Sequence, residues 1–296
     1  MAPPTSRERR ETAAPPRRPR GGGHEAIRRG GLLFLLTLPL PALAAPPTTL
    51  PEVVARHPHD PAAFTQGLAW ADGWLYESTG LYGASSLRRY RPGERGGTLR
   101  ALSPRLFGEG LVVVGDRLIQ LTWRAGLALV WRRNDLTLQG RFGYRGEGWG
   151  LAYDGRRLYH SDGSATITLR DPVTFRERGR LEVHIDGKPL ARLNELEWVE
   201  GELWANVFES PRIARIDPRS GRVLGWIDLG ALRPPETRTD RLAVANGIAY
   251  APETRRLFVT GKRWPVLYEL ALPAKRPSHS ANQDASPSAA NGGEMK

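Results

Sequence analysis

The stretch Gln66-Gly-Leu-Ala-Trp70 returns in related form four more times along the chain, and this repetition decides the fold. The later copies are Glu109-Gly-Leu-Val-Val113, Trp149-Gly-Leu-Ala-Tyr153, Asn194-Glu-Leu-Glu-Trp198 and Asn246-Gly-Ile-Ala-Tyr250. From copy to copy the first aliphatic residue moves by 43, 40, 45 and 52 residues. Repeats of about 40–45 residues that are built from short strands are typical of propeller blades. We therefore predict an all-β fold, a five-bladed β-propeller over residues 51–272.

The residues around each copy support this interpretation. Apolar and polar residues alternate over short runs, and Asp-Gly, Gly-Asp or Glu-Gly pairs mark the turns. Third strands are predicted at 86–90, 128–131, 166–169 and 212–216. The last copy lacks a fourth strand, whereas 52–56 precedes the first copy without a partner. We expect this N-terminal strand to close the ring by pairing into the fifth blade, which would protect both sheet edges. An open pair of β-sandwiches is the alternative.

Both ends of the chain differ in composition from the repeats. Residues 1–30 hold eight Arg against three acidic residues, and a short apolar run and an Ala-x-Ala pattern ending at Ala44 follow. This order is typical of a secretory signal peptide, so we expect residues 1–44 to be removed and the protein to be periplasmic or secreted. A disordered basic arm before a cytosolic domain is the alternative. Residues 273–296 are rich in Ser, Ala, Asn and Pro, which predicts a disordered tail.

Charge and cysteine content exclude several classes of protein. About +5 of the net charge of +12 belongs to residues 1–30, and the remaining basic residues are scattered, so we expect no nucleic-acid partner. No apolar run after the signal is long enough to span a membrane. The chain has no Cys, which excludes disulfide scaffolds, Cys-based zinc sites and thiol nucleophiles. A closed ring has no free sheet edge that demands a partner, so we expect a monomer.

Aligning the copies places one residue of each inner strand at the mouth of the central channel. This first ring contains Gln66, Glu109, Trp149, Asn194 and Asn246. A second ring, four residues past each apolar pair, contains Gly80, Trp123, Gly163, Phe208 and Lys262. Together they predict an apolar cup with a few polar groups, which is typical of a site for a small molecule or a chain end.

The chemistry of such a cup is restricted. The first ring has one acid, and no His, Cys or Ser stands in a triad-like setting, which also disfavours a two-carboxylate glycosidase. No His pair on one strand has metal-ligand spacing. His57 and His59 are two residues apart, but we expect them on an exposed edge. We therefore predict no metal and no cofactor. Burial among aromatics should raise the pKa of Glu109 and suit it to proton transfer. Alternatively, Glu109 holds channel waters, the tryptophans fill the channel, and the amides satisfy buried backbone groups.

The chain also contains several longer motifs that are more specific than the repeat. They are Phe64-Thr-Gln-Gly-Leu68, Glu77-Ser-Thr-Gly-Leu-Tyr82, Ser85-Ser-Leu-Arg88, Leu193-Asn-Glu-Leu-Glu197, Trp204-Ala-Asn-Val207, Arg212-Ile-Ala-Arg-Ile-Asp217 and Val259-Thr-Gly-Lys262. In this order they resemble the plant-type glutaminyl-peptide cyclotransferases, which also occur in bacteria and are five-bladed propellers. The resemblance covers residues 51–271. It implies conversion of N-terminal glutaminyl residues of peptides and proteins to pyroglutamyl residues with release of ammonia, and no zinc site.

The same resemblance implies roles for individual residues. The family's catalytic acid/base falls on Glu109, and its substrate pocket falls on Phe64, Gln66, Trp123, Trp149, Asn194 and Lys262. Phe208 belongs to the same wall but departs from the Trp that the family commonly has there, so an indole N–H donor is lost. Two other functions stay open at this point. One is a secreted, non-catalytic propeller that binds peptide or glycan ends, and the other is a Ca²⁺-dependent lactonase or esterase propeller.

Overall fold

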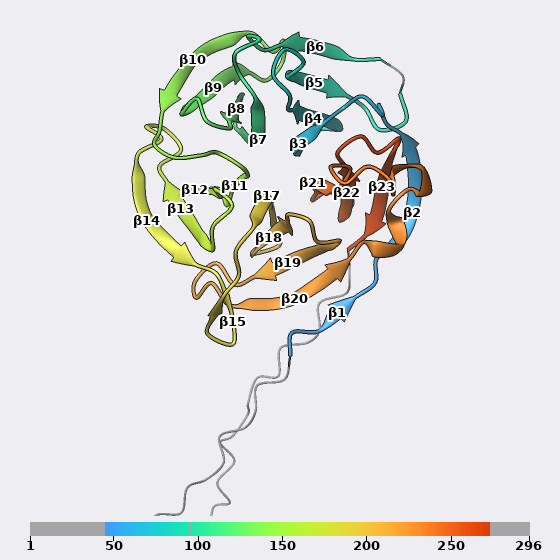
Figure 1. The fold of residues 1–296 in the computed structure, drawn as a ribbon. Coiled ribbons are helices and arrows are strands. Elements are labelled where there is room, and N and C mark those ends of the chain that lie inside the picture. Colours follow the sequence, from blue (N-terminus) through green and yellow to red (C-terminus); the bar gives the residue numbers. More distant parts are fainter. Residues whose placement is uncertain (1–44, 95, 273–296) are drawn as a thin grey trace, which may run out of the picture. The chain divides into compact units, whose positions relative to one another are not determined.

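The computed structural model describes residues 45–94 and 96–272, and the expected signal peptide and tail lie outside these residues. Five antiparallel sheets stand around a central axis, each running from an inner strand to an outer one (Figure 1). The predicted five-bladed propeller is therefore confirmed. Sheets in this arrangement bury their apolar faces against neighbouring blades, so short alternating strands are sufficient to build a core.

The blades follow one another in sequence order. Blade 1 contains β3 (Thr65–Ala71), β4 (Trp74–Thr79), β5 (Ser86–Tyr90) and β6 (Thr98–Ala101). Blade 2 contains β7 (Gly108–Val114), β8 (Arg117–Thr122), β9 (Leu127–Arg132) and β10 (Leu138–Gly143). Blade 3 contains β11 (Leu151–Tyr153), β12 (Leu158–His160), β13 (Thr166–Arg170) and β14 (Glu177–Glu182). Blade 4 contains β17 (Leu193–Val199), β18 (Glu202–Val207), β19 (Arg212–Ile216) and β20 (Val223–Asp228).

Blade 5 closes the ring with residues from both ends of the described chain. Its strands are β21 (Ala245–Ala251), β22 (Arg256–Gly261), β23 (Val266–Ala271) and β2 (Glu52–Pro58). β2 pairs antiparallel with β23 from Glu52 opposite Ala271 to Pro58 opposite Val266. The N-terminal strand therefore supplies the missing fourth strand, as the sequence predicts.

Smaller elements were not predicted from the sequence. β1 (Thr48–Thr49) adds a parallel fifth strand to blade 4, and β15 (His184–Ile185) pairs with β16 (Lys188–Pro189) as a short hairpin. Two 3₁₀ turns, η1 (Gly230–Leu232) and η2 (Pro235–Thr237), lie between blades 4 and 5. These turns account for the longest spacing between copies, which is 52 residues.

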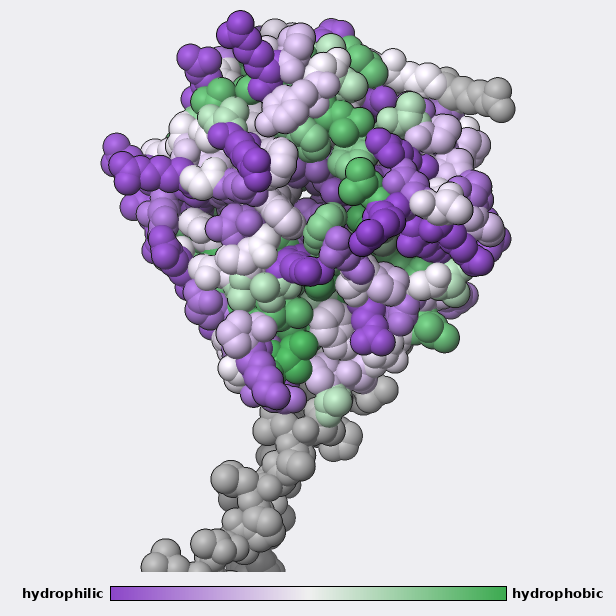
Figure 2. Space-filling model, in the orientation of Figure 1, coloured by the Kyte–Doolittle hydropathy of each residue, from purple (hydrophilic) through white to green (hydrophobic). Residues whose placement is uncertain are grey.

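The core lies between the blades and is anchored on the repeated aliphatic residue of each inner strand. Its five members are at most 1% exposed and are Leu68, Leu111, Leu151, Leu196 and Ile248. Burying one such side chain contributes about 1.5–3 kcal/mol. Within 45–94 and 96–272 no helix is long and apolar enough to cross a membrane. Hydrophilic residues are spread around the face drawn in Figure 2 and are not gathered into one stripe.

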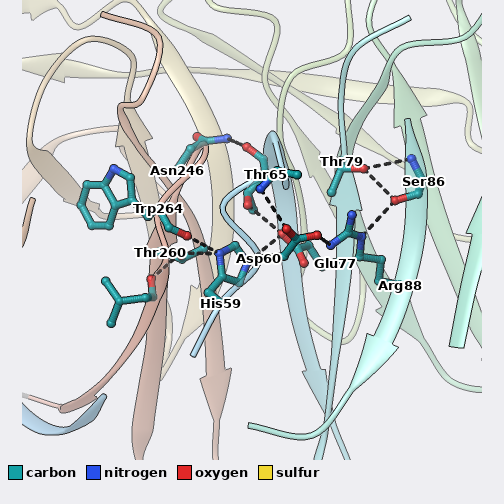
Figure 3. A network of polar contacts seen from close by, with 12 residues as sticks. His59, Asp60, Thr65, Glu77, Thr79, Ser86, Arg88, Asn246, Thr260 and Trp264 are labelled. Carbon is teal, nitrogen blue, oxygen red and sulfur yellow. Dashed lines mark hydrogen bonds and ion pairs between the residues drawn. The ribbon is translucent and has the colours of Figure 1, made fainter. Parts of the chain in front are cut away.

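One expectation about the edge of blade 5 is wrong. His57 and His59 were both expected on an exposed edge, but His57 is half-buried with its Nε2 3.0 Å from Glu269 Oε2, and His59 is 8% exposed and lies between blades 5 and 1. Its Nε2 lies 3.1 Å from Glu77 Oε1, and its Nδ1 lies 2.7 Å from the carbonyl oxygen of Trp264 (Figure 3). The chain leaves β2 after Pro58 and turns inward, so His59 connects blade 5 with β4 of blade 1. Sequence periodicity ends with the strand and gave no sign of this turn.

Candidate active site

A backbone irregularity in four blades sets the direction of the first-ring side chains. The pairing of the inner strand with its neighbour shifts at Thr65/Gly67, Gly108/Leu111, Leu193/Leu196 and Ala245/Ile248. Such bulges insert an unpaired residue and redirect its side chain. The inner strands also approach one another closely here, since a Cβ added at Gly150 would lie 2.0 Å from the carbonyl oxygen of Asn194. The repeated glycine therefore permits the crowding that gathers the first ring.

The turns that carry the second ring are alike, as the alignment requires. In four blades the second-ring N–H donates to the carbonyl two residues before the first-ring position. The four bonds join Gly80 to Phe64 at 2.8 Å, Trp123 to Phe107 at 3.0 Å, Phe208 to Arg192 at 2.8 Å and Lys262 to Val244 at 2.9 Å. Both rings consequently belong to one mouth of the channel.

Glu109 lies at the floor of this mouth and is 5% exposed. Gln66 Nε2 donates to Glu109 Oε1 at 2.8 Å, and Asn246 Nδ2 donates to Gln66 Oε1 at 3.2 Å. Three of the five first-ring residues thus form one hydrogen-bonded chain. Asn194 is also buried, and its carbonyl oxygen accepts a 2.6 Å hydrogen bond from Ser161 Oγ.

Aromatic rings and one lysine form the walls around Glu109. The Lys262 Nζ atom lies 4.9 Å from the centre of the Phe64 ring and 5.2 Å from that of Phe208. Phe208 meets Trp149 edge to face with centroids 5.7 Å apart. On the opposite side Phe107 lies 5.5 Å from Trp123 and 6.1 Å from Phe64. The structure therefore brings the sequence-predicted wall residues together.

Two wall residues, Phe107 and Glu147, were not predicted from the sequence. Glu147 Oε2 accepts hydrogen bonds from Trp123 Nε1 at 2.7 Å and Trp149 Nε1 at 3.0 Å, which completes the circle of contacts. The signal was available in the repeat. Both residues stand two positions before the first ring, at the same place as Phe64. A third alignment at that position would have found them.

Burial controls the protonation of the two ionisable groups at the floor. It raises the pKa of Glu109 well above its ordinary value, because the positive charge of Lys262 opposes the shift only in part and Glu147 adds to it. Burial lowers the pKa of Lys262 to about 8, against the influence of Glu109. At the rim, burial would raise the pKa of Glu147, but hydrogen bonds from Trp149, Arg124 and Trp123 outweigh it and lower that pKa. The floor thus holds a carboxyl group that gains a proton readily.

A further carboxyl group, Glu195, lies in the channel and was also missed. It occupies the position that is Gly in the other four copies, and it is fully buried. Its Oε1 accepts from the backbone N–H of Leu68 at 3.2 Å and its Oε2 from that of Ile248 at 2.9 Å. Glu195 therefore links the inner strands of three blades. The break in the repeated glycine is the signal that could have identified it.

Within the part of the chain that the structure describes, neither a metal cluster nor the cavity between β2 and blade 1 coincides with this mouth. Among the described residues no three His, Cys, Asp or Glu side chains gather closely enough to hold a metal ion. A cavity of about 430 Å³ lies elsewhere, between the end of β2, blade 1 and the loop before β6. None of the first-ring residues lines it. The convergence of Glu109, Lys262 and the aromatic walls is the stronger argument for the site, because the ionisable groups that line this cavity are already paired with one another, as His59 is with Glu77 and Arg88 with Asp60.

A buried carboxyl group in an aromatic cup on a propeller axis is an arrangement typical of an enzyme site for a small group or a chain end. The comparisons with known proteins identify which one. The family model for glutamine cyclotransferase matches residues 32–272, so the chain belongs to the glutamine cyclotransferase family. The predicted enzyme class, a glutaminyl-peptide cyclotransferase, is thereby confirmed.

Two individual relatives agree with this membership. A glutaminyl-peptide cyclotransferase of Arabidopsis thaliana is 43% identical over 227 residues, which cover 75% of this chain and 71% of the plant protein. The crystal structure of Myxococcus xanthus glutaminyl cyclase superposes with a TM-score of 0.71 at 37% identity, covering 76% of this chain and 97% of the other.

Proposed function

We propose that Glu109 is the general acid/base that closes an N-terminal glutaminyl residue into pyroglutamyl. The observation that carries this role is the position of Glu109 at the floor of the mouth, with Oε1 held by Gln66 and with Lys262 and aromatic walls around it. The substrate's own amine and γ-carbonyl carbon form a five-membered ring, so the enzyme needs to supply orientation and proton transfer.

The chemical steps balance around this one residue. The free α-amine of the substrate attacks its γ-carbonyl carbon, and a C–N bond forms while the amine gives a proton to the Glu109 carboxylate. The protonated Glu109 then returns that proton to the γ-amide nitrogen, the old C–N bond breaks, and ammonia leaves. The raised pKa of Glu109 lies nearer to that of an amine, which favours transfer in both directions.

The other residues of the mouth bind and orient in this proposal. Lys262, Asn194 and Gln66 hold the γ-amide and the negative charge that develops on its oxygen. The rings of Phe64, Trp123, Trp149 and Phe208 enclose the methylenes and exclude water. The N-terminal residue of a peptide or protein enters the mouth, while the rest of the substrate stays outside.

The test is ammonia release from a peptide with N-terminal Gln, measured with chelator present, for the wild type and Glu109→Gln. We expect activity in the wild type and a loss of about 10²–10⁴-fold in the variant, with an unchanged circular dichroism spectrum. Near wild-type turnover by Glu109→Gln would overturn the assignment. No cyclisation by the wild type would favour the non-catalytic binding propeller, and loss of activity in chelator would favour a metal-dependent enzyme.

We also propose that the protein is exported with residues 1–44 as its signal and acts as a monomer in the periplasm or outside the cell. The basic, apolar and Ala-x-Ala order of these residues supports this proposal. Expression of the full chain followed by fractionation and N-terminal sequencing tests it. A mature protein that begins at Ala45 is expected, whereas an uncleaved cytoplasmic protein would contradict export.

A further inference from the structure

Glu147 joins two blades at the rim of the mouth. It lies in the segment between β10 and β11, two residues before Trp149, and it faces Trp123, which follows β8. Its Oε2 accepts both indole N–H groups, at 2.7 and 3.0 Å. Its Oε1 accepts from Arg124 Nε at 2.9 Å, and the Arg124 guanidinium lies 3.8 Å from the centre of the Trp123 ring. One carboxylate thus holds three side chains.

These contacts fix each indole from two sides. Trp123 has Arg124 on its face and Phe107 beside it, and its N–H donates to Glu147 at 2.7 Å. Trp149 packs against Phe208, and its ring passes so close to Gly163 that a Cβ there would lie 2.8 Å away. Hydrogen bonds to a charged group are stronger than those between neutral groups. The shared oxygen therefore links the two rings, which belong to neighbouring blades.

We infer that Glu147 is a positioning residue, which holds Trp123 and Trp149 at the separation that clasps the methylenes of an N-terminal glutaminyl side chain. This inference rests on the proposed function of the mouth. A preorganised wall improves substrate binding chiefly by removing the cost of ordering it on arrival. Loss of Glu147 should therefore raise KM more than it lowers kcat.

The charge of Glu147 has a second effect that a purely structural residue would lack. The ionisable groups that face Glu109 are Lys262, Glu147 and Tyr144. Lys262 lowers the pKa of Glu109 and Glu147 raises it. Removing the charge of Glu147 lowers the pKa of Glu109, so the acid limb of kcat/KM should move to lower pH. A neutral variant and a shorter charged variant separate this effect from positioning.

The experiment compares Glu147→Gln and Glu147→Asp with a matched control, Glu177→Gln. Glu177 lies on the outer strand β14 and pairs with Arg180 at 2.9 Å, so this control removes the same charge far from the mouth. With a Gln-Ala peptide we expect KM to rise about tenfold for both Glu147 variants, while kcat stays within about threefold. The acid limb should shift for Glu147→Gln alone, and Glu177→Gln should match the wild type.

Repeating the Glu147→Gln substitution in a protein that already lacks both indoles shows whether Glu147 acts through the tryptophans. Residues that work as a unit have non-additive effects, so Glu147→Gln should change KM less than about twofold in a Trp123→Phe/Trp149→Phe protein. A full tenfold loss in that background, or a wild-type KM for Glu147→Gln or Glu147→Asp, would overturn the inference. Failure of the proposed function itself is distinguishable, because the wild type would then release no ammonia.

Discussion

Two buried carboxyl groups, Glu77 and Glu109, lie in neighbouring blades and have opposite environments. Glu77 is 1% exposed and accepts hydrogen bonds from Thr65 Oγ1 at 2.7 Å and from His59 Nε2 at 3.1 Å (Figure 3). Glu109 is 5% exposed, and within the described part of the chain its side chain receives one hydrogen bond, from the neutral amide of Gln66. Both are removed from water, but only Glu77 has a charged partner in contact.

The pKa values of the two groups differ in direction for this reason. Burial would raise the pKa of Glu77, but the charge and hydrogen bond of His59 outweigh it and lower the pKa. Both His59 nitrogens face oxygen atoms, Nδ1 facing the carbonyl of Trp264, which is the arrangement that a protonated ring donating from both nitrogens fits. The pKa of Glu109 is raised, because burial is not offset by a comparable partner. A fully paired carboxylate stabilises the junction of blades 1 and 5, whereas a poorly paired one is available for proton transfer.

Glu77→Gln should give the largest effect on stability that this comparison predicts. Removal of one partner leaves His59 buried without its counter-charge, so the free energy of unfolding should fall by about 3 kcal/mol. Denaturant unfolding followed by circular dichroism measures this change. The matched control is Glu109→Gln, which removes a carboxyl group of similar burial and should cost no stability. Equal losses for the two variants would contradict the distinction between them.

Lys262→Gln tests the weak partner of Glu109. Among the described residues, no ion pair closer than 4.0 Å joins Lys262 to Glu109, although the charge of each shifts the pKa of the other. We expect kcat/KM to fall about 100-fold, because a donor to the developing oxyanion is lost. In the wild type, activity should also fall as the pH rises through about 8, where Lys262 loses its proton, and this limb should be missing from the variant. An unchanged pH–rate profile would argue against a role for the Lys262 charge.

The Glu77–His59 pair should make the stability of the fold depend on pH. The direction of each pKa shift decides whether the contribution of that residue is lost at high or at low pH. The pKa of His59 is raised above 6.5, since Glu77 outweighs the effect of burial, so its contribution is complete below pH 6.5 and is lost as the pH rises through the folded value. The pKa of Glu77 is lowered below 4.5, so its contribution is complete above pH 4.5 and is lost as the pH falls through the folded value. The pair therefore contributes most between about pH 4.5 and 6.5.

Melting curves of the wild type and Glu77→Gln across pH 3–9 measure this window. The difference in melting temperature between the two proteins should be largest inside it and should narrow on both sides. A difference that does not vary with pH would mean that packing, and not charge, connects His59 to Glu77.

The same two regions show what the sequence reveals and what it does not. The mouth could be predicted because each blade repeats one pattern, so position within the repeat fixes position around the axis for Gln66, Glu109 and Lys262. His59 lies outside the repeated pattern, in the connection after the closing strand, and its burial depends on where that connection turns. Glu147 and Glu195 do lie within the pattern, but their types differ from those of their counterparts. Their contacts to other blades depend on side-chain reach, which strand periodicity does not encode.

Phe208→Trp should have the smallest effect on KM and on stability. It tests whether the wall of the mouth can be changed without disturbing the fold. Phe208 is half-buried between Trp149 and Lys262. The indole would add an N–H donor to the wall, so KM for an N-terminal Gln peptide should fall about threefold with kcat unchanged. The free energy of unfolding should stay within about 0.5 kcal/mol, since a rim position has room to adapt.

Phe208→Leu is the matched control for this change, because it keeps an apolar wall without an aromatic face for Lys262. We expect a higher KM and again an unchanged stability, in contrast to Glu77→Gln, which should lose stability and keep its activity in the folded fraction. A loss of stability in Phe208→Trp without a change in KM would place Phe208 with the structural residues. The mouth would then be packed as tightly as the junction of blades 1 and 5, and pairing of the carboxyl group alone would distinguish the two regions.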